Sequence, residues 1–245
     1  MPARLLRPSL QHGLALGLAL CMISAHAEHT PMPLPQMAAT SPFPLTLQPL
    51  AQAVAEGDVH GIVALVRRRP GTTRGQDNVT LLEWAIWNRQ ADSLAALLQA
   101  GFAPSTPGME GESVAHLAAS VDDPRYLQVL ARHGAPLDLI GGHAARTPIF
   151  RAVQSRRDAQ FEQLLAAGAD INRSDASGNT LLHVAAEVGD ARRVLQLLQA
   201  GAAHDRANIR GVRFQSLLFA QDMARLSAKG RSERDAVMRW LSANQ

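Results

Sequence analysis

Residues 178–186 read Gly-Asn-Thr-Leu-Leu-His-Val-Ala-Ala, and a leucine pair and a glycine follow at Leu197-Leu198 and Gly201. Similar segments begin at intervals of 33, 34 and 33 residues, at Thr80, Ser113, Thr147 and Thr180. Glycines with the same intervals each follow a leucine-rich run, at Gly101, Gly134, Gly168 and Gly201. Two landmarks that share one spacing indicate an internal repeat, and a repeat of this length predicts a stacked solenoid.

At these residues the chain resembles the ankyrin repeat family. The segment Gly168-Ala169-Asp170-Ile171-Asn172 matches the ending of a family repeat, and the resemblance extends from about Pro49 to Asn208. Each copy reads as a turn, a short helix opened by Thr or Ser, a tight link, and a second helix closed by glycine. Because one such unit cannot bury its apolar stripe alone, we predict an all-α ankyrin-repeat solenoid of helix-turn-helix units.

The spacing also predicts where the units lie. Four full repeats are expected at about 75–107, 108–141, 142–174 and 175–208. An N-terminal capping unit is expected at 49–74, and capping helices at 209–245, where Ser232 would cap a last helix with Val237, Trp240 and Leu241 on one face. The glycine between the two helices of a repeat is Gly189 in one copy and a different residue in the others, at Arg89, Asp122 and Arg156. Those links therefore either have a strained positive φ or adopt another conformation.

Residues 1–27 have the three parts of a secretory signal. Arg4 and Arg7 precede an apolar stretch at 13–23, and Ala25-His26-Ala27 forms a small-x-small site. We expect cleavage between Ala27 and Glu28 and a periplasmic protein, because the stretch is too short to remain as a stable membrane anchor. Lipid attachment at Cys21 is the alternative, although a bulky leucine precedes it. Without Cys21 the mature chain has no cysteine, and therefore no disulfide or thiolate chemistry.

Residues 28–48 form a proline-rich lead. Proline at this density blocks helices and central strands, so the lead should be extended. One interpretation makes it a spacer. The other makes it lie back over the folded domain through its apolar residues Met32, Leu34, Phe43 and Leu45.

Composition and motifs exclude several classes of protein. The 245 residues are 47% hydrophobic and 18% charged, which is typical of a globular chain. Without Arg4 and Arg7 there are 22 basic and 21 acidic residues, so no global field favours nucleic acid. The histidines are scattered, and no metal-ligand, phosphate-loop or nucleophile motif is present, so we expect no metal, no cofactor and no catalytic residue. The family resemblance implies that His116 and His183 hydrogen-bond the turns.

The resemblance also implies that the turn tips and the exposed positions of each first helix contact a partner. The phase of the repeats then gives the expected partner-binding residues, which are Trp84, Trp87, Leu117, Arg151, Val184, Glu187, Glu110 and His143. Tryptophan is the residue most enriched at interface hot spots. The alternative is that the N-terminal cap or the lead covers Trp84 and Trp87.

A solenoid offers a long, preformed surface, which lowers the ordering cost of association. We therefore expect a non-catalytic, monomeric module that binds another protein, whether a toxin, an enzyme or an envelope protein. Similarity to exported bacterial ankyrin proteins implies two roles: an immunity protein against a toxin delivered into the periplasm, such as a lipase, or an accessory protein in peroxide defence. A secreted effector acting in a host and an enzyme are further alternatives.

Overall fold

The computed structural model describes residues 41–67, 74–220 and 222–244. The chain divides into two units, Met1–Thr30 and Pro31–Gln245, and all described residues lie in the second. The described residues form helices and short turns with isolated β-bridges and no strands, which confirms the all-α prediction. The expected signal segment, Cys21 and the lead up to residue 40 lie outside the described residues.

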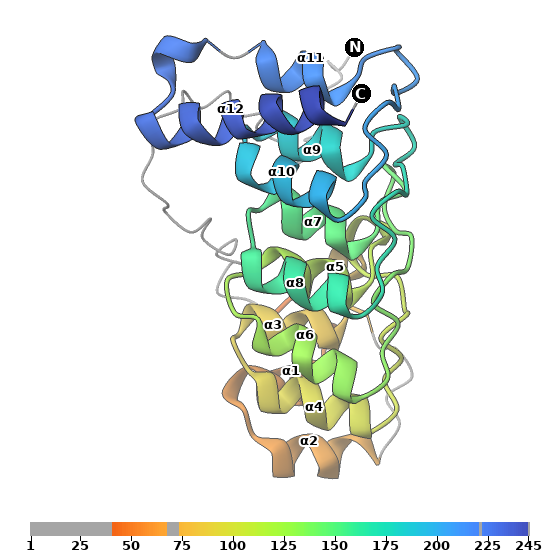
Figure 1. Cartoon of the computed structure of the whole chain (residues 1–245). Helices are drawn as coiled ribbons and strands as arrows, with labels where there is room; N and C mark the ends of the chain where they lie inside the picture. Colours follow the sequence, from red (N-terminus) through yellow and green to blue (C-terminus); the bar gives the residue numbers. More distant parts are fainter. Residues whose placement is uncertain (1–40, 68–73, 221, 245) are drawn as a thin grey trace, which may run out of the picture. The chain divides into compact units, whose positions relative to one another are not determined.

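Helices pair within each repeat, and the pairs stack in chain order (Figure 1). The first helices of the pairs are α1 (Gln48–Glu56), α3 (Leu81–Trp87), α5 (Val114–Ser120), α7 (Pro148–Gln154), α9 (Leu181–Glu187) and α11 (Phe214–Phe219). The second helices are α2 (Val59–Val66), α4 (Ala91–Gln99), α6 (Arg125–Arg132), α8 (Asp158–Ala166), α10 (Ala191–Gln199) and α12 (Ala228–Ala243). Short 3-10 turns are η1 (Gln76–Asn78), η2 (Met109–Gly111) and η3 (Met223–Arg225). Each first helix packs on the first helix of the next pair, so the apolar stripes join into one core.

Histidines fix two of the first helices to the following turn. The Nδ1 atom of His183 lies 2.9 Å from the Thr180 hydroxyl and accepts the Thr180 N–H at 3.1 Å. Its Nε2 atom lies 3.0 Å from the carbonyl oxygen of Val212, in the next turn. His116 makes the equivalent contacts with Ser113 and with the Arg146 carbonyl. The structural role expected for both histidines is therefore confirmed.

The helix α7 departs from this arrangement because Phe150 stands where histidine is expected. Phe150 is fully buried and has no polar atom to offer the capping residue. The Thr147 hydroxyl is consequently buried without a hydrogen-bond partner among the described residues. An unpaired buried hydroxyl is destabilising, because it loses its hydrogen bonds to water and gains none in return.

The sequence left two alternatives for the links between paired helices, a strained positive φ or another conformation, and the structure contains both. Arg89 and Arg156 have φ angles of 59° and 54°, in the left-handed region that Gly189 adopts at 68°. The link after α5 instead has extended backbone at Val121, and Pro124 leads into α6. Arginine at a left-handed position is strained because its Cβ crowds the backbone, and glycine is not.

The helices α11 and α12 close the described stack, with α11 packed on α9 and α12 packed on α10. Val237 is fully buried and Trp240 and Leu241 pack against the core, so the predicted apolar face of the last helix is confirmed. The prediction that Ser232 caps this helix was wrong. The helix begins one turn earlier, where the Ser227 hydroxyl accepts the N–H of Gly230 at 3.1 Å.

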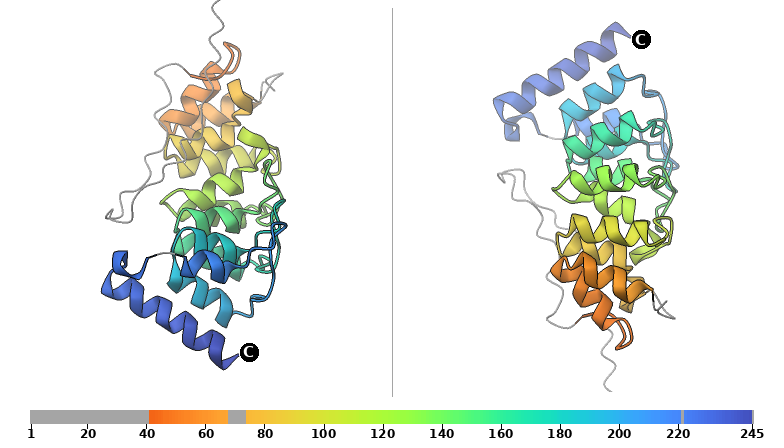
Figure 2. Two further views of the ribbon diagram at one scale, coloured as in Figure 1. Left: turned by 90° about the horizontal axis from the view of Figure 1, so that it is seen from above. Right: turned by 90° about the horizontal axis from the view of Figure 1, so that it is seen from below.

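The turns that precede the first helices lie side by side along one edge of the stack (Figure 2). Backbone hydrogen bonds join neighbouring turns: Gly142 N donates to Gly111 O, Ala176 N to Ala144 O, and Ile209 N to Ser177 O. At the N-terminal end, Pro42 O accepts from Gln76 N at 2.9 Å. The start of the described chain thus contributes to the first turn the carbonyl that a preceding repeat would otherwise supply.

Candidate functional site

The fourth and seventh residues of each first helix share one side of that helix, because residues three apart in a helix are neighbours. We call the side formed by these positions of α3, α5, α7 and α9, together with the turns before those helices, the binding face. The helix positions are held by Trp84 and Trp87, Leu117 and Ser120, Arg151 and Gln154, and Val184 and Glu187. Seven of these eight side chains keep some exposure to solvent.

Aromatic rings occupy the N-terminal part of the binding face. Trp84 is partly buried, and its indole N–H donates to Ala51 O of α1 at 2.9 Å. The rings of Phe43 and Trp84 meet edge to face with centroids 5.7 Å apart, and Trp87 continues the row 6.4 Å from Trp84. The N-terminal residues therefore cover Trp84 in part, as the alternative interpretation expected. Trp87 and Leu117 are also partly buried and keep one side accessible.

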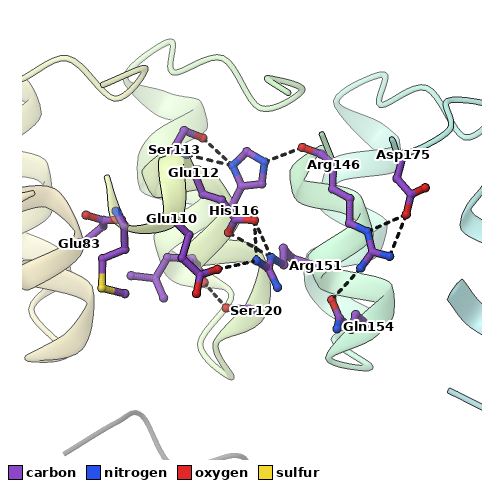
Figure 3. Close-up of polar contacts among 12 residues, drawn as sticks. Glu83, Glu110, Glu112, Ser113, His116, Ser120, Arg146, Arg151, Gln154 and Asp175 are labelled. Carbon is purple, nitrogen blue, oxygen red and sulfur yellow. Dashed lines mark hydrogen bonds and ion pairs between the residues drawn. The ribbon is translucent and has the colours of Figure 1, made fainter. Parts of the chain in front are cut away.

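An ion-pair cluster occupies the centre of the binding face. Arg151 Nη2 and Nε lie 2.6 and 2.9 Å from Glu112 Oε1, and Glu110 Oε2 lies 3.6 Å from the same Nη2 (Figure 3). Glu110 is at the tip of η2 with a φ of 53°, and its side chain is 63% exposed. Glu112 therefore makes the close two-point contact with the guanidinium, and the more exposed Glu110 makes a longer ion pair with it.

A second ion pair lies one repeat further along. Arg146 donates from Nε and Nη2 to Asp175 Oδ2 at 3.1 and 2.9 Å, and from Nη1 to Gln154 at 3.3 Å (Figure 3). The Asp175 carboxylate also accepts the backbone N–H of Ser177 and Asn179. Burial opposes its ionisation, but the hydrogen bonds from Arg146 and from these backbone groups hold the pKa of Asp175 below its usual value.

Sequence reasoning missed Glu112, Arg146 and Asp175. Glu112 and Arg146 each precede a capping Ser or Thr by one residue, so the repeat phase placed them beside the first helices. The sequence did not indicate which side chains form ion pairs, because Arg146 pairs with Asp175, 29 positions away, and Arg151 pairs with Glu112, 39 positions away.

Glu83 occupies the position that His116 and His183 hold in their repeats. The two histidines contact a carbonyl oxygen of the next turn, whereas Glu83 accepts an N–H from it. Its carboxylate accepts the N–H and the hydroxyl of Thr80 at 2.8 and 2.9 Å, and the N–H of Met109 at 3.1 Å. Burial raises the pKa of Glu83 above its usual value, and the hydrogen bonds from Thr80 and Met109 oppose the shift. A Cβ on Gly108 would stand 2.2 Å from the Glu83 oxygens, so only glycine fits beside this carboxylate.

The expectation that Val184 contacts a partner was wrong. Val184 is 1% exposed and belongs to the same hydrophobic core as Phe214 and Leu218. Glu187, one turn further along α9, is exposed, and His143 is exposed in the turn before α7. The part of the binding face that keeps exposure to solvent therefore runs from Trp87 through Leu117 and Arg151 to Glu187.

Within residues 41–67, 74–220 and 222–244, no three His, Cys, Asp or Glu side chains come together in a way that could hold a metal ion. No helix of those ranges has the length and hydropathy of a membrane span.

Known proteins share this architecture. The ankyrin repeat model matches residues 177–210. Protein PhlB of Serratia liquefaciens is 43% identical over 139 residues, and the nuclear factor NF-kappa-B p105 subunit of Gallus gallus is 34% identical over 112 residues. These matches cover 57% and 44% of this chain, but only 61% and 11% of the two relatives.

Solved structures agree with this likeness. The ankyrin repeat domain of Bcl-3 is 26% identical with a TM-score of 0.66, and the match covers 79% of this chain and 85% of that one. A chain of the complex between the Bd0816 predatory endopeptidase from Bdellovibrio bacteriovorus and the immunity protein Bd3460 has a TM-score of 0.63 at 22% identity, with coverage of 78% and 97%. The repeat spacing, the stacked helix pairs and these likenesses lead to one conclusion: this chain belongs to the ankyrin repeat family.

Proposed function

We propose that this protein is a non-catalytic periplasmic binding protein that neutralises a protein toxin by covering it with the binding face. The observation that supports the proposal best is the row of partly exposed side chains on consecutive first helices, Trp87, Leu117 and Arg151. Aromatic residues and arginine are the side chains most enriched at interface hot spots, and these three present an apolar patch beside a charged one.

The binding face is also held rigid before any partner arrives. Backbone hydrogen bonds join neighbouring turns. The side chains of Glu83, His116 and His183 also bond α3, α5 and α9 to the turns that follow them. Arg151 is already fixed by Glu112. Because few side chains must be ordered on association, more of the contact energy is available for affinity, as tight inhibition of a toxin requires.

The immunity role is supported by the likeness to a chain of the endopeptidase complex that contains the immunity protein Bd3460. Ankyrin repeats serve as protein-interaction scaffolds, which fits a stoichiometric inhibitor. The periplasmic location rests on the signal pattern of residues 1–27.

The test begins with an affinity pull-down using the chain from Glu28 onward as bait. Periplasmic extract and lysate expressing the adjacent genes are the two sources, and mass spectrometry identifies the bound proteins. One stoichiometric partner with hydrolase activity that the bait inhibits would support the immunity role. Catalase as the partner, or capture of no single protein, would contradict it and favour a stress-accessory role.

Variants then test whether the binding face is used. Trp87→Ala and Arg151→Ala should each weaken affinity for the captured partner by about tenfold or more, measured by calorimetry. Arg132→Ala is the matched control, because Arg132 is exposed on α6, outside the binding face. Equal affinities for all three variants would show that the partner binds elsewhere.

A further inference from the structure

The described chain begins against the aromatic part of the binding face. Phe43 is 3% exposed and its ring meets Trp84, while Pro42 O is bonded to the first turn at Gln76. Leu45, which the sequence also expected to lie back over the domain, is 81% exposed. Ser41, the first described residue, is therefore two residues from the ring that meets Trp84, and Trp87 is the next ring in the row.

The chemistry of that preceding segment suits an aromatic surface. Residues 31–40 read Pro-Met-Pro-Leu-Pro-Gln-Met-Ala-Ala-Thr and contain no charged side chain. Alternating prolines favour the polyproline II conformation, which is preformed and docks on aromatic-lined surfaces at a small entropic cost. Met32 and Leu34 stand between the prolines and provide the apolar contacts.

We propose that residues 31–40 of this chain dock on Trp87 and Leu117 and occupy the N-terminal part of the binding face until a protein partner displaces them. The intramolecular contact is inferred from the seating of Phe43 on Trp84 and from the uncharged, proline-rich composition of residues 31–40. Its displacement by a partner rests on the proposed function.

Length and tethering both favour this contact. Leu34 is seven residues before Ser41, a span of about 20 Å in polyproline II conformation. The ring centroids from Phe43 to Trp84 and from Trp84 to Trp87 are 5.7 and 6.4 Å apart, so Trp87 is within that span of the anchored Phe43. A short tether gives an effective concentration of about a millimolar, so a contact with a dissociation constant of about a millimolar is half populated.

Another apolar surface could receive the same segment. The helix α2 has the sequence Val-His-Gly-Ile-Val-Ala-Leu-Val, yet Ile62 is its one fully buried residue, and Val63 is 44% exposed. The aromatic row is preferred because Phe43, from the same stretch of chain, is already seated on it. The experiment separates the two surfaces.

The test places a bimane fluorophore at position 34, because tryptophan quenches bimane only at close contact. The chain from Glu28 onward lacks Cys21, so Leu34→Cys is its single labelling site. Fluorescence in this variant should be at least about twofold lower than in the same variant with Trp87→Phe, as expected for a quenching contact that is at least half populated. Trp240→Phe, the matched control at the other end of the stack, should leave the quenching unchanged. Met32→Asp should relieve the quenching by disfavouring the apolar contact.

Three results would overturn the proposal. The first is fluorescence that does not depend on Trp87. The second is quenching that disappears on dilution, which would show that another copy of the chain supplies the tryptophan. The third is quenching that requires a tryptophan introduced by Val63→Trp, which would place the segment on α2. Recovery of fluorescence when the captured toxin is added would support displacement. Quenching that depends on Trp87 but persists under saturating toxin would support the intramolecular contact and refute its displacement by the partner.

Discussion

Replacing Thr147 with valine tests the energetic consequence of the Phe150 substitution. The Thr147 hydroxyl is fully buried and has no partner among the described residues, whereas the Thr180 hydroxyl lies 2.9 Å from His183 Nδ1. Valine has nearly the shape of threonine, with a methyl group in place of the hydroxyl. The same substitution at the two sites therefore removes an unpaired polar group in one case and a hydrogen bond in the other.

The expected magnitudes follow from these environments. A buried polar group without a partner costs about 1 to 3 kcal/mol, and part of this is regained when a methyl group replaces it. We expect Thr147→Val to raise the free energy of unfolding by about 1 kcal/mol. Thr180→Val should lower it by about 1 kcal/mol, because the cap loses its side-chain bond. For a chain of this size each change corresponds to a shift of roughly 3 °C in Tm, in opposite directions.

Urea denaturation followed by circular dichroism measures both variants on the same wild-type baseline. Because repeat arrays can open unit by unit, amide hydrogen exchange in α7 and α9 assigns each change to its own repeat. Protection should rise in α7 for the Thr147 variant and fall in α9 for the Thr180 variant.

A double-mutant cycle makes the reasoning refutable. Phe150→His supplies the missing ring nitrogen, so in that background Thr147→Val should change sign and become destabilising. We expect the background variant itself to lose stability because histidine fills less volume than phenylalanine, but the cycle measures only the coupling between the two positions. An equal loss of stability at Thr147 and Thr180, or a Thr147 effect that ignores residue 150, would refute the unpaired-hydroxyl interpretation.

Four further substitutions test the backbone, the buried carboxylate and the core. Arg89→Gly should raise the free energy of unfolding by about 1 kcal/mol by relieving a left-handed φ, and Gly189→Ala should lower it by a similar amount in the same denaturation assay. Burial raises the pKa of Glu83, so its contribution to stability is full below the ordinary pKa and is lost as pH rises through the raised value. Glu83→Gln should therefore become more stable relative to wild type between pH 4.5 and pH 7, and a constant difference in unfolding free energy over that range would contradict this. Leu164→Ala should cost about 2 to 5 kcal/mol by opening a cavity in the fully buried core while leaving partner affinity unchanged in calorimetry.

The sequence alone determined the period, the fold class and the side of α3, α5 and α7 that keeps some exposure to solvent. These follow from local rules: a capping Thr or Ser, a helical stripe of leucines and a closing glycine recur at fixed spacing, and a stripe that one unit cannot bury requires stacking. The roles of His116 and His183 were also accessible, because both hold the repeat's own histidine position.

Only the tertiary structure decided which side chains meet between units. Val184 and Leu117 hold the same position in their helices, yet Val184 is buried and Leu117 is partly exposed. Glu112 pairs with Arg151 across 39 residues, and Trp84 donates to Ala51 across 33. Such contacts depend on how closely one unit packs on the next and on which rotamer reaches across the gap. The spacing of residues within one repeat does not encode these quantities, so the detail of the binding face emerged only when the units were stacked.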